Sequence, residues 1–106
     1  EHFEYDALLC VANWPAPRRQ PWRTLLQARA VENLCYVIGV NRVGEDAKGL
    51  AYAGDSMLVD FKGEPLIDEP RDVPFMRTGC LDRQALSAFR DKFPAWMDAD
   101  RFQVEE

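Results

Sequence analysis

The sequence predicts an α/β domain, and three consecutive segments carry that prediction. An apolar run at residues 5–14 is followed by a stretch with helical spacing at 21–34 and by a second apolar run at 35–43. Strand, helix and strand in this order are typical of a parallel crossover unit. With 106 residues, 47% of them hydrophobic, the chain is long and apolar enough to bury a core.

The first predicted strand covers residues 5–14 and ends at two prolines. Its centre, ALLCVA, is a continuous apolar run, which is typical of a strand buried on both faces. Pro15 and Pro17 end the strand because proline cannot donate to a strand ladder. Asn13 and Trp14 therefore stand at its carboxyl end, where α/β sheets gather ligand-binding groups. A turn with a half-buried aromatic ring is the alternative interpretation.

A helix is predicted over residues 21–34. Pro21 suits its first turn, and apolar residues then recur at helical spacing. These are Trp22, Leu25, Leu26, Ala30 and Leu34. Arg29 and Glu32 lie three positions apart on this helix and are placed to pair with each other. If Glu32 is buried it needs a partner, and such a carboxylate is more often a structural clamp than a base.

Three arginines, Arg18, Arg19 and Arg23, surround the start of this helix. A guanidinium group binds a carboxylate with two hydrogen bonds, and the helix dipole also attracts anions at this end. An anion-binding site fits this pattern, and so does a solvated, charged entry to the helix.

After the second strand, CYVIGVNRV, the sequence predicts a polar loop, a hairpin and a further strand. GEDAKG at 44–49 forms the loop. SMLVDF and EPLID flank a tight turn in which Gly63 takes a positive φ. Residues 54–56, GDS, form a turn before the hairpin, because they lack the strand-to-helix context of a nucleophile elbow. The further strand is expected at 73–81.

The last predicted helix covers residues 82–93. Asp82 is placed to cap it, Leu86, Phe89 and Phe93 line one side, and Pro94 follows its end. Residues 94–106 have no clear period and are expected to form an extended tail.

The reactive residue types give little support to nucleophilic catalysis through a histidine base. Cys10, Cys35 and Cys80 are far apart and odd in number, which fits neither a disulfide framework nor a metal site. Each lies in an apolar stretch, so packing in the core is favoured over catalysis. The single histidine, His2, lies at the N-terminus, which leaves a Ser/His/Asp or Cys/His mechanism without a base.

Charge and hydropathy limit the partners. The net charge of -5 opposes binding to nucleic acid through counterion release. The longest apolar stretch, residues 7–12, is far shorter than the roughly 20 residues that span a bilayer, and the pattern of a signal peptide is missing. We therefore expect a soluble, cytoplasmic protein that binds neither nucleic acid nor membrane.

Three segments together resemble the later part of a carbon-nitrogen hydrolase of the nitrilase superfamily, and most closely the bacterial ω-amidases. They are VANWPAPRRQPWRTLLQARAVENLCYVIGVNRVG, YAGDSMLVDFKGEPL and FRDKFPAWMDAD. The resemblance spans nearly the whole chain and implies that residues 1–106 are the C-terminal portion of one such domain. It also implies a four-layer αββα sandwich and subunits that pair as a homodimer.

The resemblance implies a reaction and a division of roles. In this family a cysteine thiolate attacks an amide or nitrile carbon, a glutamate is the base and a lysine holds the oxyanion, without metal or organic cofactor. None of these three maps onto this sequence, so an N-terminal portion of the enzyme would supply them and this chain alone would be inactive. Asn13 and Trp14 match a segment beside the nucleophile, which implies a substrate-binding role. Glu32, with Arg29, matches a structural or orienting position.

The implied substrate is a small dicarboxylic acid monoamide such as 2-oxoglutaramate, cleaved to the acid and ammonia. Two alternatives stay open. One is another activity of the superfamily, such as that of a nitrilase or carbamoylase. The other is a non-catalytic interaction module whose sheet edge and apolar tail bind another chain.

Overall fold

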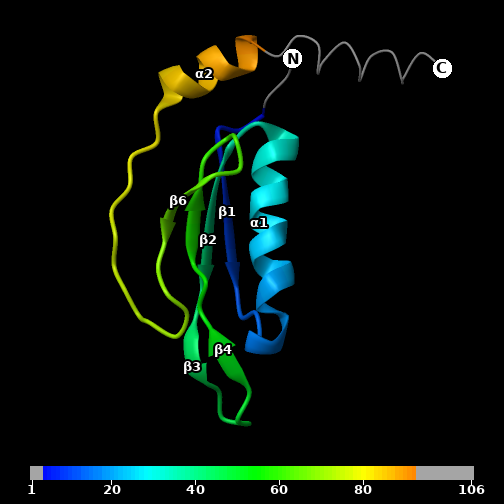
Figure 1. Cartoon of the computed structure of the whole chain (residues 1–106), viewed down its shortest axis with the longest axis vertical. Helices are drawn as coiled ribbons and strands as arrows, with labels where there is room; N and C mark the ends of the chain where they lie inside the picture. The colour runs from blue at the N-terminus through cyan, green and yellow to red at the C-terminus, as the bar shows by residue number, and fades with distance from the viewer. Residues whose placement is uncertain (1–3, 93–106) are drawn as a thin grey trace, which may run out of the picture.

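A four-stranded sheet forms the centre of the computed structural model, which describes residues 4–92 (Figure 1). The strands pair in the order β1-β2-β5-β6. They span Ala7–Ala12, Tyr36–Asn41, Met57–Val59 and Pro65–Asp68. β1 and β2 are parallel, whereas β2 with β5 and β5 with β6 are antiparallel. The predicted α/β class is confirmed.

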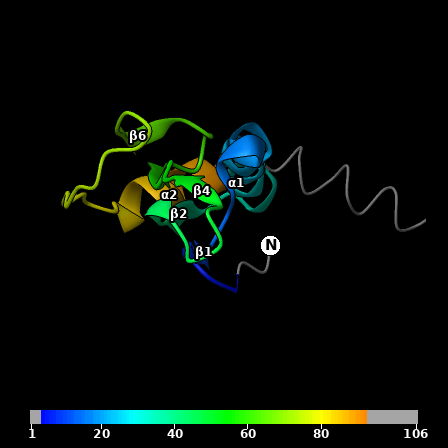
Figure 2. The same cartoon turned by 90° about the horizontal axis from the view of Figure 1, so that it is seen from below.

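The predicted strand–helix–strand unit is also confirmed. After β1, a short 3-10 helix, η1, spans Ala16–Arg18, and α1 spans Arg19–Asn33 before the chain returns as β2. Pro21 lies in the first turn of α1, where a backbone N–H has no partner within the helix. Leu34 ends α1 in the left-handed conformation, with φ of 47°. Figures 1 and 2 show α1 lying along one face of the sheet.

The main core lies between α1 and the sheet face that it covers. Its buried residues are Trp22, Leu26, Ala30, Cys35, Val37, Met57 and Val59. The helix lies close to β2 because Gly39 has no side chain. A Cβ atom at Gly39 would lie 2.5 Å from one δ-carbon of Leu26 and 2.8 Å from the other.

The prediction that β1 is buried on both faces is wrong for this chain. Leu8, Cys10 and Ala12 pack toward the core, whereas Leu9 is 62% exposed and Val11 is 72% exposed. Side chains alternate between the two faces of a strand, and the described residues leave the second face uncovered at this edge of the sheet.

Two hairpins follow β2. β3, Val43–Glu45, pairs with β4, Ala51–Ala53, in a separate two-stranded sheet where the sequence predicts only a polar loop. The loop itself is shorter, because the Asp46 carboxylate accepts hydrogen bonds from the backbone of the residues around it and folds the chain back. The predicted β5–β6 hairpin is confirmed, and Gly63 has φ of 86° in its turn.

The strand predicted at 73–81 is absent, because residues 69–82 form neither strand nor helix. A strand needs a neighbouring edge to pair with, and Pro74 removes one donor. The connection instead passes on the side of the sheet opposite α1 (Figures 1 and 2). Cys80 lies in this connection and is exposed, which corrects the prediction that it packs in the core. Cys35 is buried and Cys10 is partly buried.

The last helix, α2, spans Arg83–Asp91, close to its predicted bounds. The Asp82 side chain accepts a hydrogen bond from the backbone N–H of Ala85, so the predicted cap is confirmed. Leu86 is buried in a second cluster with Tyr36 and Phe61, and Phe89 packs against it. Phe93, Pro94 and the tail at 94–106 lie outside the described residues.

Candidate functional site

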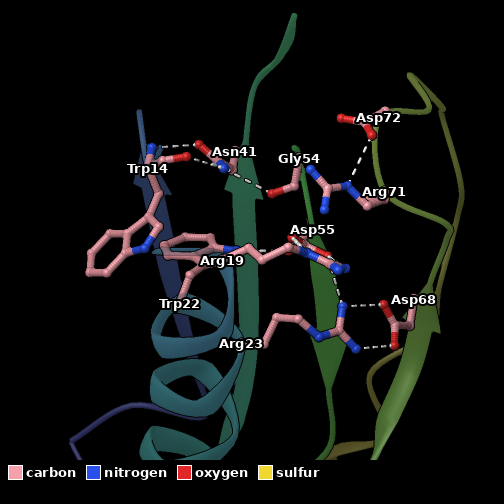
Figure 3. Close-up of polar contacts among 10 residues, drawn as sticks. All are labelled: Trp14, Arg19, Trp22, Arg23, Asn41, Gly54, Asp55, Asp68, Arg71 and Asp72. Carbon is pink, nitrogen blue, oxygen red and sulfur yellow. Dashed lines mark hydrogen bonds and ion pairs between the residues drawn. The ribbon is translucent and has the colours of Figure 1, made fainter. Parts of the chain in front are cut away.

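Asn41 joins the carboxyl ends of β1 and β2 (Figure 3). Its side-chain oxygen accepts a hydrogen bond from the backbone N–H of Trp14 at 2.8 Å. Its amide nitrogen donates to the Trp14 carbonyl at 3.0 Å and to the Gly54 carbonyl at 2.8 Å. The backbone N–H of Asn41 donates to the Ser56 hydroxyl, which donates to the Asn41 carbonyl. One amide side chain thus connects β1, β2 and the turn before β5.

The two residues predicted to contact substrate lie side by side at this strand end. Trp14 is half-buried, and its ring packs against Trp22 with 5.5 Å between ring centroids and a tilt of 38°. Its indole N–H donates to the carbonyl of Arg18, so the ring folds back toward η1. Asn13 is exposed. The strand end therefore presents an accessible amide beside a firmly held aromatic ring.

A buried carboxylate, Asp55, lies next to Trp22, with its side chain only 1% exposed. Arg19 binds both carboxylate oxygens, at 2.9 Å through Nε and 2.8 Å through Nη2. Arg23 adds a third hydrogen bond at 3.0 Å. The backbone carbonyl of Asp55 accepts a hydrogen bond from the Trp22 indole at 2.7 Å. Asp55 thereby links the β4–β5 turn to the first turns of α1 (Figure 3).

Opposing effects set the ionisation of this cluster. Burial raises the pKa of Asp55, but the hydrogen bonds and charges of Arg19 and Arg23 outweigh burial and hold that pKa below its usual value. The hydrogen bond to Asp68 raises the pKa of Arg23, against the opposite effect of burial. Asp55, Arg19 and Arg23 are therefore charged at neutral pH.

The arginines at the helix start do bind anions, but these anions belong to the chain itself. Arg23 makes two hydrogen bonds to Asp68 of β6, at 2.8 and 2.6 Å, in addition to its contact with Asp55. Arg18 is exposed. The GDS pattern predicts the turn but not the contacts of Asp55. The available clue was a single acidic residue between two apolar runs in a chain with three arginines at one helix start.

Arg29 and Glu32 lie on the outer side of α1. Their side chains pair at 3.4 Å, which confirms the predicted contact. They are 49% and 62% exposed, so the described part of the chain does not bury this pair.

A cavity of about 490 Å³ opens on the sheet face opposite α1. Its walls come from β2, β5, β6 and the 73–77 segment, and include Ile38, Leu58, Ile67 and Phe75. Trp14 is not part of this cavity, since it packs on the α1 side.

Two of the three cysteines, Cys35 and Cys10, lie in the main core or pack against it. Burial raises the pKa of the Cys35 thiol, whereas a nucleophilic thiol needs a lowered pKa. Cys10 packs toward the core beneath α1.

In the part of the chain that the structure describes, no group of three or more His, Cys, Asp or Glu side chains is arranged to hold a metal ion. Neither helix of this part has the length and apolar character needed to cross a membrane.

Fold and sequence together define the class of protein. The family model for carbon-nitrogen hydrolases matches residues 7–91, and the chain belongs to that family.

Particular relatives refine this assignment. The chain is 46% identical over 101 residues to omega-amidase YafV of Escherichia coli (strain K12), a match that covers 95% of this chain and 40% of that protein. It is 33% identical over 93 residues to a 2-oxoglutaramate amidase of Bacillus subtilis (strain 168), covering 88% of this chain and 35% of that protein. The chain thus spans about 40% or less of the length of these relatives.

Solved structures confirm the fold. A carbon-nitrogen hydrolase superfamily protein from Xanthomonas campestris, which carries an arsenic adduct in its active site, superposes with a TM-score of 0.85 at 47% identity. That match covers 90% of this chain and 36% of the other. A carbon-nitrogen hydrolase from Helicobacter pylori shares the fold, with a TM-score of 0.75 at 20% identity. The predicted membership of the nitrilase superfamily is therefore confirmed.

Proposed function

We propose that this chain is the C-terminal portion of an amidohydrolase that cleaves the terminal amide of small dicarboxylic acid monoamides. The substrate class is that of 2-oxoglutaramate, and the products are the acid and ammonia. The observation that carries this proposal is the 46% identity to an omega-amidase across 95% of this chain. The match to a 2-oxoglutaramate amidase supports the same substrate class.

The proposed reaction passes through a cysteine thioester. A thiolate attacks the amide carbon, a glutamate delivers a proton to the departing nitrogen, and ammonia leaves. Water, deprotonated by the same glutamate, then cleaves the thioester to the carboxylic acid and the free thiol. A lysine holds the oxyanion in both steps. We assign the cysteine, glutamate and lysine to an N-terminal portion outside these 106 residues, so this chain alone is inactive.

Within this proposal the end of β1 forms one wall of the substrate site. The exposed amide of Asn13 is suited to hydrogen-bond a carbonyl or amide of the substrate, and the Trp14 indole shields that wall from water. The rigid attachment of Trp14 to Asn41 supports this role, because a binding wall must keep its shape. Arg29 and Glu32 act at a distance from the substrate, as an orienting pair.

The uncovered face of the sheet supports the existence of a second portion. Leu9 is 62% exposed, Val11 is 72% exposed and Val40 is 43% exposed, on neighbouring strands β1 and β2. Clustered exposed apolar side chains are typical of a surface that another chain covers. We assign this face to the N-terminal portion, which would complete an αββα sandwich. The complete enzyme is proposed to be a cytoplasmic homodimer without a cofactor.

Reconstitution tests the proposed function. The chain is mixed or co-expressed with the N-terminal portion, and ammonia release is measured with 2-oxoglutaramate, simple nitriles and carbamoyl amino acids. We expect hydrolysis of 2-oxoglutaramate by the mixture and by neither portion alone. Faster turnover of nitriles or carbamoyl amino acids would assign the chain to another branch of the superfamily.

The exposed face also fits a non-catalytic interaction module, which binds another chain without turnover. In the same experiment, tight association combined with no hydrolysis of any of the three substrate classes favours the module and overturns the enzyme proposal.

A further inference from the structure

The β4–β5 turn holds two consecutive residues in the left-handed region. Gly54 has φ of 86° and Asp55 has φ of 58°. This conformation suits glycine and is unfavourable for other residues, although Asp tolerates it better than most. A Cβ atom at Gly54 would also lie 2.8 Å from a γ-carbon of Val43. The surrounding contacts must therefore hold the turn in place.

These two residues connect to Trp14 by separate routes (Figure 3). The Gly54 carbonyl accepts a hydrogen bond from Asn41, whose amide also binds the backbone N–H and carbonyl of Trp14. The Asp55 carbonyl accepts a hydrogen bond from the Trp22 indole, which packs against the Trp14 ring. The first route fixes the main chain of Trp14 and the second fixes its ring.

The carboxylate of Asp55 keeps the turn directed inward. Trp22 and Arg23 follow Arg19 by three and four positions, so all three side chains lie on one face of α1. Each of them binds Asp55. Arg23 is held in turn by Asp68. Without the negative charge, the two guanidinium groups would repel each other at this place, and the turn would lose its attachment to α1.

We propose that Asp55 is a positioning residue for the substrate wall: through Arg19, Arg23 and Trp22 on one side and the adjoining Gly54 carbonyl on the other, it sets the orientation of the Trp14 ring and of the neighbouring Asn13. This inference rests on the proposed function, since it assumes that Asn13 and Trp14 face the substrate. The GDS segment, residues 54–56, thereby takes part in substrate binding indirectly, by positioning residues that contact the substrate.

The first test is spectroscopic. Two indoles at 5.5 Å with a fixed tilt produce an exciton-coupled circular dichroism signal. The difference between the protein and its Trp14→Phe variant isolates that signal from the signals of the two remaining tryptophans, Trp22 and Trp96. We expect Asp55→Asn to remove most of this signal while the helical signal stays. Arg19→Gln, at a side chain that is 35% exposed, is a milder change that leaves Arg23 in place, and we expect it to reduce the signal partly.

Asp60→Asn is the matched control. Asp60 also organises a turn, since its carboxylate accepts hydrogen bonds from the backbone of Lys62 and Glu64 at 2.9 and 3.0 Å. It lies in the β5–β6 turn and has no route to Trp14 among these contacts. A positioning role predicts that Asp60→Asn keeps the exciton signal. An unchanged signal in both Asp55→Asn and Arg19→Gln overturns the proposal.

The second test measures kinetics in the chain reconstituted with the N-terminal portion. We expect Asp55→Asn to lower kcat/KM for 2-oxoglutaramate about tenfold, mainly through KM, because the wall is misplaced and the reacting groups are not. Asp60→Asn should stay within about twofold. Equal losses in the two variants would show a purely structural role and overturn the proposal. If the unmodified mixture hydrolyses no amide, the proposed function fails, while the spectra of the chain still decide the role of Asp55.

Discussion

Asn41 shows how far single residues can be predicted here. Asn13 is recognisable because it follows an apolar strand, and Asn41 is the last residue of the next strand, where it pairs with Ala12. Its partners, however, are Trp14 and Gly54, which lie 27 and 13 positions away. A local pattern cannot specify contacts between such distant residues, so the position of the strand end was predictable and the side chain that holds it was not.

We predict that Asn41→Ala destabilises the fold by about 2 kcal/mol, because it leaves partly buried backbone groups of Trp14 and Gly54 without partners. Denaturant unfolding measures the change. Asn33→Ala is the matched control, since Asn33 donates to the carbonyl of Arg29 at an exposed helix end, and it should cost less than about 1 kcal/mol. Equal losses in the two variants would contradict the role of Asn41.

The ionisation of Asp55 predicts how the stability of the fold depends on pH. Its pKa is lower in the folded chain than in the unfolded chain, so its contribution to stability is present above the unfolded value, about 4, and is lost as the pH falls through the folded value. The free energy of unfolding should decrease on acidification below about pH 4, and less steeply in Asp55→Asn. Denaturant melts across pH 2–6 measure both slopes, and parallel slopes would refute this account.

Elements with a regular period and enough length were predictable. α1 shows apolar residues at helical spacing after Pro21, and α2 has its cap at Asp82. β3 and β4 have three residues each, VGE and AYA, and show no clear apolar run, whereas the equally short β5 is the apolar run MLV and is recognisable. The strand expected at 73–81 has suitable residues but no partner edge within the described part of the chain. Pairing is decided by tertiary structure, which a local pattern does not contain.

The contact between α1 and β2 allows a prediction at the element scale. Gly39→Ala places a methyl group 2.5 Å from a δ-carbon of Leu26, whose side chain is fully buried. We expect a loss of about 1–3 kcal/mol from overpacking. In a background carrying Leu26→Ala, the same substitution should cost much less, because the δ-carbons are gone. Additive effects in this double-mutant cycle would contradict the packing argument.

The uncovered sheet face determines the behaviour of the whole molecule. The chain buries a core beneath α1 but leaves Leu9 and Val11 open on the other side of β1. The sequence showed that these residues are apolar, and the resemblance implied a second layer. Only the structure shows which face is left open.

We predict that the chain alone self-associates through this face. A variant with Leu9→Ser and Val11→Ser should be more soluble alone and bind the N-terminal portion at least tenfold more weakly, because both effects depend on the same apolar surface. Val31→Ser, at a position on α1 that is 50% exposed, is the control and should change neither property. Sedimentation measures the self-association of the chain, and titration measures its binding to the N-terminal portion. An unmodified chain that sediments as a monomer would contradict this prediction.

In the proposed enzyme this chain provides a substrate wall, while the reacting thiol belongs to the N-terminal portion. The most direct test is to mix the two portions with 2-oxoglutaramate, stop the reaction with acid and locate the acyl group by mass spectrometry. We expect a thioester on the N-terminal portion and an unmodified 106-residue chain. An acyl group on Cys10, Cys35 or Cys80 would contradict it.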